Sequence, residues 1–98
     1  MIIEYSIGDT APAIDIEIDN FDLTADPATT VEVAIGMTAG NKQMPLTVSS
    51  ATTAAGNPPD ALFFDQAGKF PAEIIITTSA IVETFRGFYV RVYESLAP

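Results

Sequence analysis

A run of alternating residues near the C-terminus, Phe85-Arg86-Gly87-Phe88-Tyr89-Val90-Arg91-Val92-Tyr93-Glu94, decides the fold. Successive side chains of an extended strand point to opposite faces of a sheet. One face of this run receives the apolar residues Phe88, Val90 and Val92. The other face receives Tyr89, Arg91 and Tyr93. We therefore predict a central β-strand whose apolar face lies against the core of an all-β domain.

The rest of the chain shows further short runs of this kind. In Ile14-Asp15-Ile16-Glu17-Ile18-Asp19, three isoleucines alternate with three carboxylates, which is the pattern of a strand with one buried face and not of a helix. The other strands are predicted at residues 2–7, 30–37, 43–48, 61–65 and 73–78. Pro45 lacks the N–H that a sheet ladder needs, so the strand at 43–48 is expected at an edge.

Two segments lack a strand period. Residues 49–60, SSATTAAGNPPD, combine small residues with one glycine and two prolines. A connection of this length without structure is unusual in a compact domain, so we expect a loop that is either mobile or ordered by a partner. Residues 79–84 lack a capping box, and they are expected to form a single helical turn or a strand corner.

The spacing of these segments predicts the fold class. About seven short strands with a turn every 8–12 residues are typical of an immunoglobulin-like antiparallel β-sandwich. A small Greek-key barrel is the alternative. The length of 98 residues fits one domain, and we assign residues 1–98 to a single β-sandwich domain. The chain contains no cysteine and no tryptophan, so it lacks the Cys–Trp–Cys pattern of antibody domains.

The charge and composition exclude several functions. The chain has 13 acidic and 4 basic residues, which give a net charge of −9. Such a charge repels nucleic acid and anionic membranes, so neither is expected as a partner. Histidine, the usual general base and the commonest transition-metal ligand, is absent. No apolar run approaches the roughly 20 residues of a membrane-spanning helix.

The chain is also short of charge. Only 17% of its residues are charged, below the roughly 25% of ordinary globular proteins. Alanine, threonine, serine and apolar groups must therefore cover much of the surface. Either this is a small soluble domain with a plain surface, or part of its surface is buried against other subunits.

The carboxylates Asp15, Glu17 and Asp19 are weak candidates for metal binding. Alternate residues of one strand lie about 6.6–6.8 Å apart and their side chains diverge, and the DxDxDG loop of calcium sites is absent. We therefore expect a solvated strand face, no metal and no cofactor. Paired acids hydrolyse glycosides only where a site raises the pKa of one of them. We find no catalytic constellation and predict that the protein is not an enzyme.

Tyr89, Arg91 and Tyr93 form an aromatic–cationic–aromatic row. Tyrosine and arginine are enriched at protein interfaces, and arginine stacks favourably on a tyrosine ring. The row is predicted to contact another subunit or a glycan, and the alternative is an ordinary outer strand face. The other predicted partner contacts, all in the 49–60 loop, are Asn57, Pro58 and Pro59.

Four segments follow one another in a recognisable order: Gly8-Asp9-Thr10-Ala11-Pro12, Asp22-Leu23-Thr24, Thr30-Val31-Glu32-Val33-Ala34-Ile35 and Arg86-Gly87-Phe88-Tyr89-Val90-Arg91-Val92. This order resembles the immunoglobulin-like N-terminal domain of phage upper baseplate proteins. Proteins of that group commonly carry GDT, a strand, DLTG, a second strand and finally a G-x-Y strand. The chain departs from the pattern after Thr24, where Ala25-Asp26-Pro27 replaces the glycine.

The resemblance implies a non-enzymatic virion component that docks through protein–protein contacts in the tail, the baseplate, a fibre attachment or the capsid decoration. Its partners would be other virion proteins, in a homo-oligomer or a multi-copy assembly. Its location would be the virion, assembled in the host cytoplasm. Burial against many copies would also explain the low charge density. The alternative function is a carbohydrate-binding or adhesin-like β-sandwich, which the absence of tryptophan disfavours.

Overall fold

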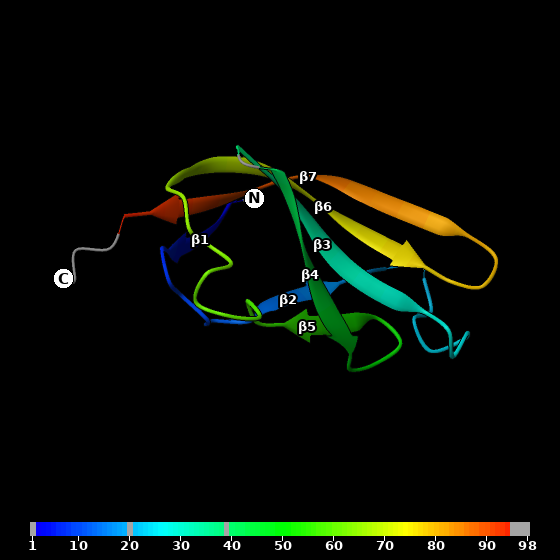
Figure 1. The fold of residues 1–98 in the computed structure, drawn as a ribbon. Coiled ribbons are helices and arrows are strands. Elements are labelled where there is room, and N and C mark those ends of the chain that lie inside the picture. Colours follow the sequence, from blue (N-terminus) through cyan, green and yellow to red (C-terminus); the bar gives the residue numbers. More distant parts are fainter. Residues whose placement is uncertain (1, 20, 39, 95–98) are drawn as a thin grey trace.

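The structure, a computed structural model, describes residues 2–19, 21–38 and 40–94. Within these residues it is all-β, which confirms the predicted class (Figure 1). The seven strands are β1 (Ile2–Ser6), β2 (Ile14–Glu17), β3 (Thr30–Met37), β4 (Gly40–Val48), β5 (Thr53–Gly56), β6 (Gly68–Thr77) and β7 (Val82–Tyr93). The described part of the chain contains no helix long and apolar enough to cross a membrane.

The strands follow the order β1-β7-β6-β3-β4-β5-β2. β4 links two layers, because its residues 40–46 pair with β3 whereas Thr47 and Val48 pair with β5 (Figure 1). The edge position predicted for the strand at 43–48 is therefore wrong, because β4 lies between β3 and β5. Pro45 is tolerated because it lies where the β4 ladder is paired with β3 only. β7, β6 and β3 share one layer, and β2 and β5 share the other, as in immunoglobulin-type sandwiches. No ladder of the described residues joins β1 to β2, so the curled sheet stays open as a half-barrel.

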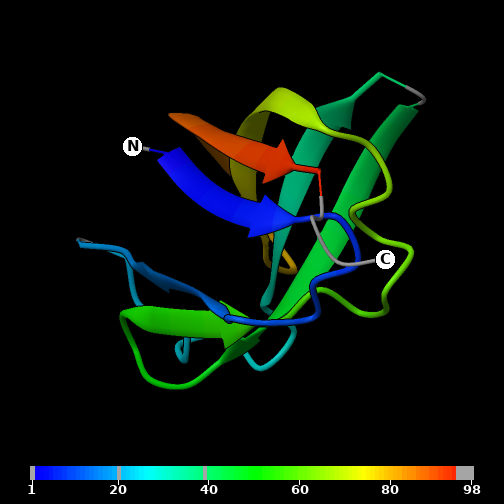
Figure 2. The same ribbon diagram turned by 90° about the vertical axis from the view of Figure 1, so that its left-hand side faces the viewer.

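One pair of strands departs from the predicted antiparallel arrangement. β1 runs parallel to β7, with Ile2 opposite Tyr89 and Ser6 opposite Tyr93. Figure 2 shows the two strands side by side, above the layer that contains β5 and β2. Parallel neighbours need a long connection, and here nearly the whole chain lies between them. The other pairs of described strands are antiparallel.

The core lies between the two layers. Its two predicted rows are at most 8% exposed: Phe88, Val90 and Val92 from β7, and Ile14, Ile16 and Ile18 from β2 and the residue after it. Both predicted inward rows are therefore confirmed. Each large apolar side chain contributes about 1.5–3 kcal/mol when it is fully buried, so these rows hold the two layers together.

The strand predicted at residues 61–65 is wrong. Phe63 and Phe64 are both buried, whereas neighbouring residues of a strand point to opposite faces. The segment forms turns in the connection from β5 to β6. Phe64 stacks on Tyr5 with 4.5 Å between the ring centroids. The two phenylalanines therefore fill the core from a loop.

The loop predicted at residues 49–60 is also partly wrong. β5 lies within it and pairs with both β2 and β4, so this segment is ordered by its own chain. The sequence Thr53-Ala54-Ala55-Gly56 shows no apolar alternation because its side chains are small. Their small size has a structural reason at one position, since a Cβ on Gly56 would lie 2.6 Å from the carbonyl oxygen of Pro45.

β6 and β7 form a long hairpin that runs along the upper layer (Figure 1). Residues 79–84 contain a strand corner and the first part of β7, and the alternative of a helical turn is wrong. The corner is closed by a hydrogen bond of 2.9 Å from the backbone N–H of Thr78 to the carbonyl oxygen of Ile81.

Candidate functional site

The outer side of β7 carries the three residues predicted there as partner contacts. Tyr89, Arg91 and Tyr93 are exposed opposite the buried row, and the two tyrosines keep 43% and 42% of their surface. The structure therefore brings these side chains together on one face. We call the surface that they form with Lys69 and Glu4 the outer β7 face.

Neighbouring strands hold this row in place. Lys69 of β6 and Glu4 of β1 both lie opposite Arg91 in the strand register. The Lys69 ammonium lies 4.5 Å from the ring centroid of Tyr89, and the Arg91 guanidinium lies 5.1 Å from that of Tyr93. Such contacts contribute about 0.5–1 kcal/mol at exposed sites. Both rings are therefore oriented within the isolated chain.

The hydroxyl group of Tyr93 donates a hydrogen bond to the Glu4 carboxylate. This bond raises the pKa of Tyr93, and desolvation adds to the rise, because both disfavour the phenolate. Sequence reasoning missed Glu4 and Lys69 as parts of this face. They lie far from Tyr93 along the chain, and only the strand pairing brings them to it.

Three of the four basic residues gather on this side of the sheet. Lys69 and Arg91 lie opposite each other, and Arg86 lies 3.2 Å from Glu73 of β6. The fourth, Lys42, is held by two backbone carbonyl oxygens and a carboxylate in the connection from β5 to β6. Most of the basic residues of this acidic chain thus lie on one side of the sheet, together with the carboxylates of Glu4 and Glu73.

A β-bulge shapes the sheet beside this face. The register between β6 and β7 shifts here, so that Arg86 and Gly87 together lie opposite Glu73. Gly87 has a φ of +106°, which glycine adopts without a steric cost. Bulges bend a strand and redirect its side chains. The ion pair between Arg86 and Glu73 is largely exposed, so it contributes less than about 1 kcal/mol.

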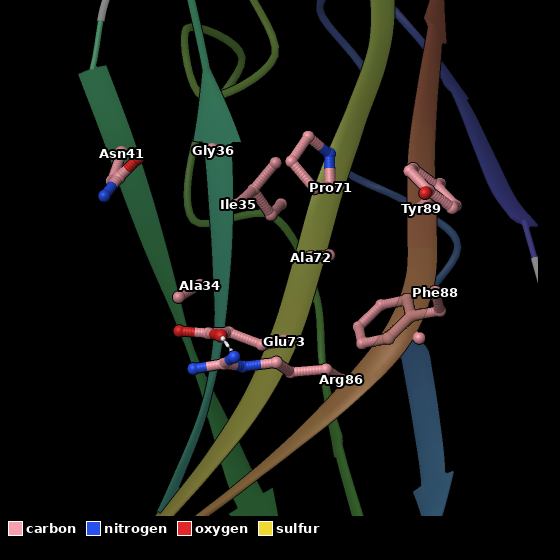
Figure 3. A pocket seen from close by; sticks show the side chains of 11 residues that line it. Ala34, Ile35, Gly36, Asn41, Pro71, Ala72, Glu73, Arg86, Phe88 and Tyr89 are labelled. Carbon is pink, nitrogen blue, oxygen red and sulfur yellow. Dashed lines mark ion pairs between the residues drawn. The ribbon is translucent and has the colours of Figure 1, made fainter.

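A shallow groove of about 290 Å³ lies beside the bulge (Figure 3). Its floor contains the small residues Ala34 and Gly36, and Pro71 lies beside them. Asn41 and Tyr89 stand on opposite sides of it, and the ion pair of Glu73 and Arg86 lies at one end. Sequence reasoning missed the groove, because four strands contribute to it and none of them carries a recognisable motif.

The predicted contacts of the 49–60 loop lie in the connection from β5 to β6. The Asn57 side-chain amide donates a hydrogen bond of 3.0 Å to the carbonyl oxygen of Thr10, in the connection from β1 to β2. Pro58 is buried, whereas Asn57 and Pro59 are exposed. The structure therefore shows this segment fastened to a neighbouring connection.

The three carboxylates considered for metal binding stay apart from the outer β7 face. Asp15, Glu17 and Asp19 are exposed. The first two lie on the face of β2 that points away from the core. Within residues 2–19, 21–38 and 40–94, no group of three or more acidic residues is placed to hold a metal ion. We call these three residues the acidic row.

Comparison with known proteins adds no relative. No protein-family model matches the chain, and no curated protein sequence matches it. The function must therefore be argued from the outer β7 face and the groove.

Proposed function

We propose that this chain is a non-enzymatic structural module that docks on other proteins through its outer β7 face. The observation that carries the proposal is the exposed row Tyr89-Arg91-Tyr93, which Lys69 and Glu4 hold in a fixed orientation. Contact residues that are already ordered lose less entropy on binding. Tyrosine and arginine are also among the residues that most often carry binding energy at interfaces.

The surface of the described residues supports burial against neighbouring proteins. Between 38% and 77% of the residue surface stays exposed at Phe85, Ile81, Ile2, Val82 and Leu62. Only 17% of all residues are charged. A module that is covered by other subunits gains stability when such apolar groups leave water.

The setting of the proposed docking is a phage particle: the tail, the baseplate, a fibre attachment or the capsid decoration. The partners are other virion proteins, and several copies of the chain assemble together. This step is supported by the resemblance of the turn and strand motifs to phage upper baseplate proteins. Two of those motifs form turns here, because the Asp9 carboxylate accepts the N–H of Ser6 at 2.8 Å and that of Asp22 accepts the N–H of Thr24 at 2.9 Å.

Purified particles from a host that carries the gene test this proposal. We expect the chain to sediment with capsid or tail proteins. A chain with Tyr89→Ala, Arg91→Ala and Tyr93→Ala, shown to be folded by circular dichroism, should stay in the unassembled fraction. Neighbouring genes for capsid, tail or baseplate proteins would be supporting evidence. Absence of the chain from particles of a host that expresses it would contradict the proposal.

Carbohydrate binding is a second candidate function, and the groove beside Tyr89 is the observation that favours it. It depends on residues such as Gly36 and Glu73, which lie outside the outer β7 face. The two functions can therefore be separated by substitution.

A further inference from the structure

We propose that the groove between β3, β6 and β7 binds a single neutral pyranose ring of a glycan. This proposal gives the second candidate function a defined site. It stands on the shape and the polar groups of the groove, and it does not depend on docking through the outer β7 face.

The groove has the dimensions of a site for one small ring. Its volume of about 290 Å³ lies just below the roughly 300–1,000 Å³ of small-molecule sites. The hollow exists because Ala34 and Gly36 leave the surface of the sheet low. A Cβ on Gly36 would lie 3.4 Å from Cγ of Pro71 and 3.6 Å from the Asn41 side-chain oxygen, which is ordinary contact distance.

Tyr89 and Pro71 supply an apolar wall. They lie opposite each other on β7 and β6, and Figure 3 shows them side by side at the groove. The face of an aromatic ring carries partial negative charge. It therefore attracts the C–H groups that line one side of a pyranose. Tyr89 keeps 43% of its surface exposed, and the sugar would share the ring with the Lys69 ammonium, which lies 4.5 Å from its centroid.

Three polar side chains complete the groove. Glu73 only accepts hydrogen bonds, Arg86 only donates them, and the Asn41 amide does both. Sugar hydroxyls are both donors and acceptors, so this mixture matches a hydroxylated ring. The planar groups of Glu73 and Arg86 can each span two neighbouring hydroxyls. An apolar side chain of a protein would cover these polar groups without bonding to them, at a free-energy cost.

The sugar is expected to be neutral. Among the described residues that line the groove, Arg86 is the one cation, and it already lies 3.2 Å from the Glu73 carboxylate. The ion pair therefore offers hydrogen bonds without a free charge. A carboxylated sugar would have to compete with Glu73 for Arg86.

Titration with methyl glycosides of glucose, galactose, mannose and N-acetylglucosamine tests the site, with amide chemical shifts as the readout. We expect at least one glycoside to cause saturable shifts at Gly36 and Gly87, with a dissociation constant on the order of 1 mM for so small a ligand. Tyr89→Ala should weaken this affinity about tenfold. Tyr93→Ala is the matched control, because Tyr93 is equally exposed on the same strand but lies outside the groove.

A second variant distinguishes a loss of sugar binding from a loss of folding. Gly36→Ala raises the floor of the groove at a position where the fold accepts a methyl group, and it should weaken sugar binding while the denaturation midpoint is kept. Gly36→Ala should leave incorporation into particles unchanged, whereas Tyr93→Ala should reduce it. The failure of either proposal can thus be told from the failure of the other.

Three results would overturn the pyranose site. The first is the absence of saturable groove shifts with all four glycosides. The second is an equal loss of binding in the Tyr93→Ala and Tyr89→Ala chains. The third is a groove that responds to a protein partner and to none of the sugars, which would assign it to a protein contact.

Discussion

At the scale of single residues, Gly56 sets the distance between β4 and β5. A Cβ at this position would lie 2.6 Å from the Pro45 carbonyl oxygen and 3.3 Å from Cα of Leu46, and neither backbone atom can move without disturbing β4. We expect Gly56→Ala to lower the free energy of unfolding by about 1–3 kcal/mol, measured by urea denaturation. Gly36→Ala is the matched control and should change it by no more than about 1 kcal/mol. Equal midpoints for the two variants would contradict this explanation.

Asp26 ties the connection between β2 and β3 to the corner of the β6–β7 hairpin. Its carboxylate accepts hydrogen bonds from the hydroxyl and the backbone N–H of Ser79, and from the backbone N–H of Ala28 at 2.8 Å. These bonds, with that from the Ser79 hydroxyl as the largest cause, lower the pKa of Asp26. Because the pKa of Asp26 is lower in the folded than in the unfolded chain, its ionised carboxylate stabilises the fold at every pH above the pKa that it has in the unfolded chain. That contribution is lost as the pH falls through the folded value.

Asp26→Asn should therefore lower the stability at neutral pH and make its fall in acid shallower. Urea denaturation at neutral pH and at a pH below the ordinary carboxyl pKa would measure both effects. Asp22, whose pKa is lowered by Thr24, acts in the same pH range, so the single variant should keep part of the acid sensitivity. Parallel curves for Asp26→Asn and the unaltered chain would rule out the proposed role of Asp26.

At the scale of elements, the strands that face the core with large side chains could be predicted from the sequence. The isoleucines of β2 and the row after Gly87 alternate strictly, and each has one buried face. β5 could not be predicted in this way. It packs closely against β4 with small residues such as Ala54, whose size hides the period. The apolar residues Phe63 and Phe64 led to the wrong prediction of a strand at 61–65, because both lie in a loop and are buried there.

From the sequence, only those residues of the candidate site that lie on β7 could be predicted. Alternation along β7 is enough to place Tyr89, Arg91 and Tyr93 on one face. Glu4 and Lys69 join them through the register of β1 and β6. That register depends on contacts between distant parts of the chain. The groove exists because Ala34 and Gly36 leave the surface of the sheet low, and small side chains form no recognisable pattern in the sequence.

β7 has an open edge before the bulge. β1 pairs with its residues 89–93 only, and residues 82–87 are all exposed. An unpaired edge invites another strand. Glu83 lies opposite Ile76, on the core side of the sheet, and a strand added here would bury its charge. Inward charges of this kind discourage pairing between sheet edges.

Replacement of Glu83 by threonine should therefore increase self-association. The mean mass in sedimentation experiments should rise with protein concentration more steeply than for the unaltered chain. Glu94→Thr is the matched control, because it removes the same charge from an exposed residue outside the edge. If both variants associate alike, net charge and not the edge residue keeps the chains apart.

At the scale of the whole molecule, the outer sides of the two layers differ in charge. The outer β7 face presents two cations, Lys69 and Arg91, and one carboxylate, Glu4. The second layer presents the acidic row, beside which Ala55 of β5 lies opposite Asp15. Small side chains beside that row, such as Ala55, leave room for the tyrosines of the outer β7 face. Docking of one copy's outer β7 face on the next copy's acidic row would be a head-to-tail contact, which builds rings or filaments.

A charge-reversal experiment tests this arrangement of copies. Each chain carries a net charge of −9, so contact requires salt; at about 0.15 M the Debye length is about 8 Å, and the general repulsion is largely screened. We expect the unaltered chain to associate under these conditions in sedimentation experiments. Arg91→Glu and Glu17→Lys should each remain monomeric, because each loses one of the two complementary faces.

The mixture of the two variants is the decisive measurement. The Arg91→Glu chain keeps its acidic row and the Glu17→Lys chain keeps its outer β7 face, so together they should form a complex with one copy of each. Glu94→Lys changes the net charge as Glu17→Lys does, at a position outside the acidic row. Because it keeps both faces, the Glu94→Lys chain should associate alone, unlike Glu17→Lys, and should form assemblies larger than a pair when it is mixed with the Arg91→Glu chain. Monomers in the first mixture would contradict head-to-tail docking and would restrict the outer β7 face to a partner of different sequence.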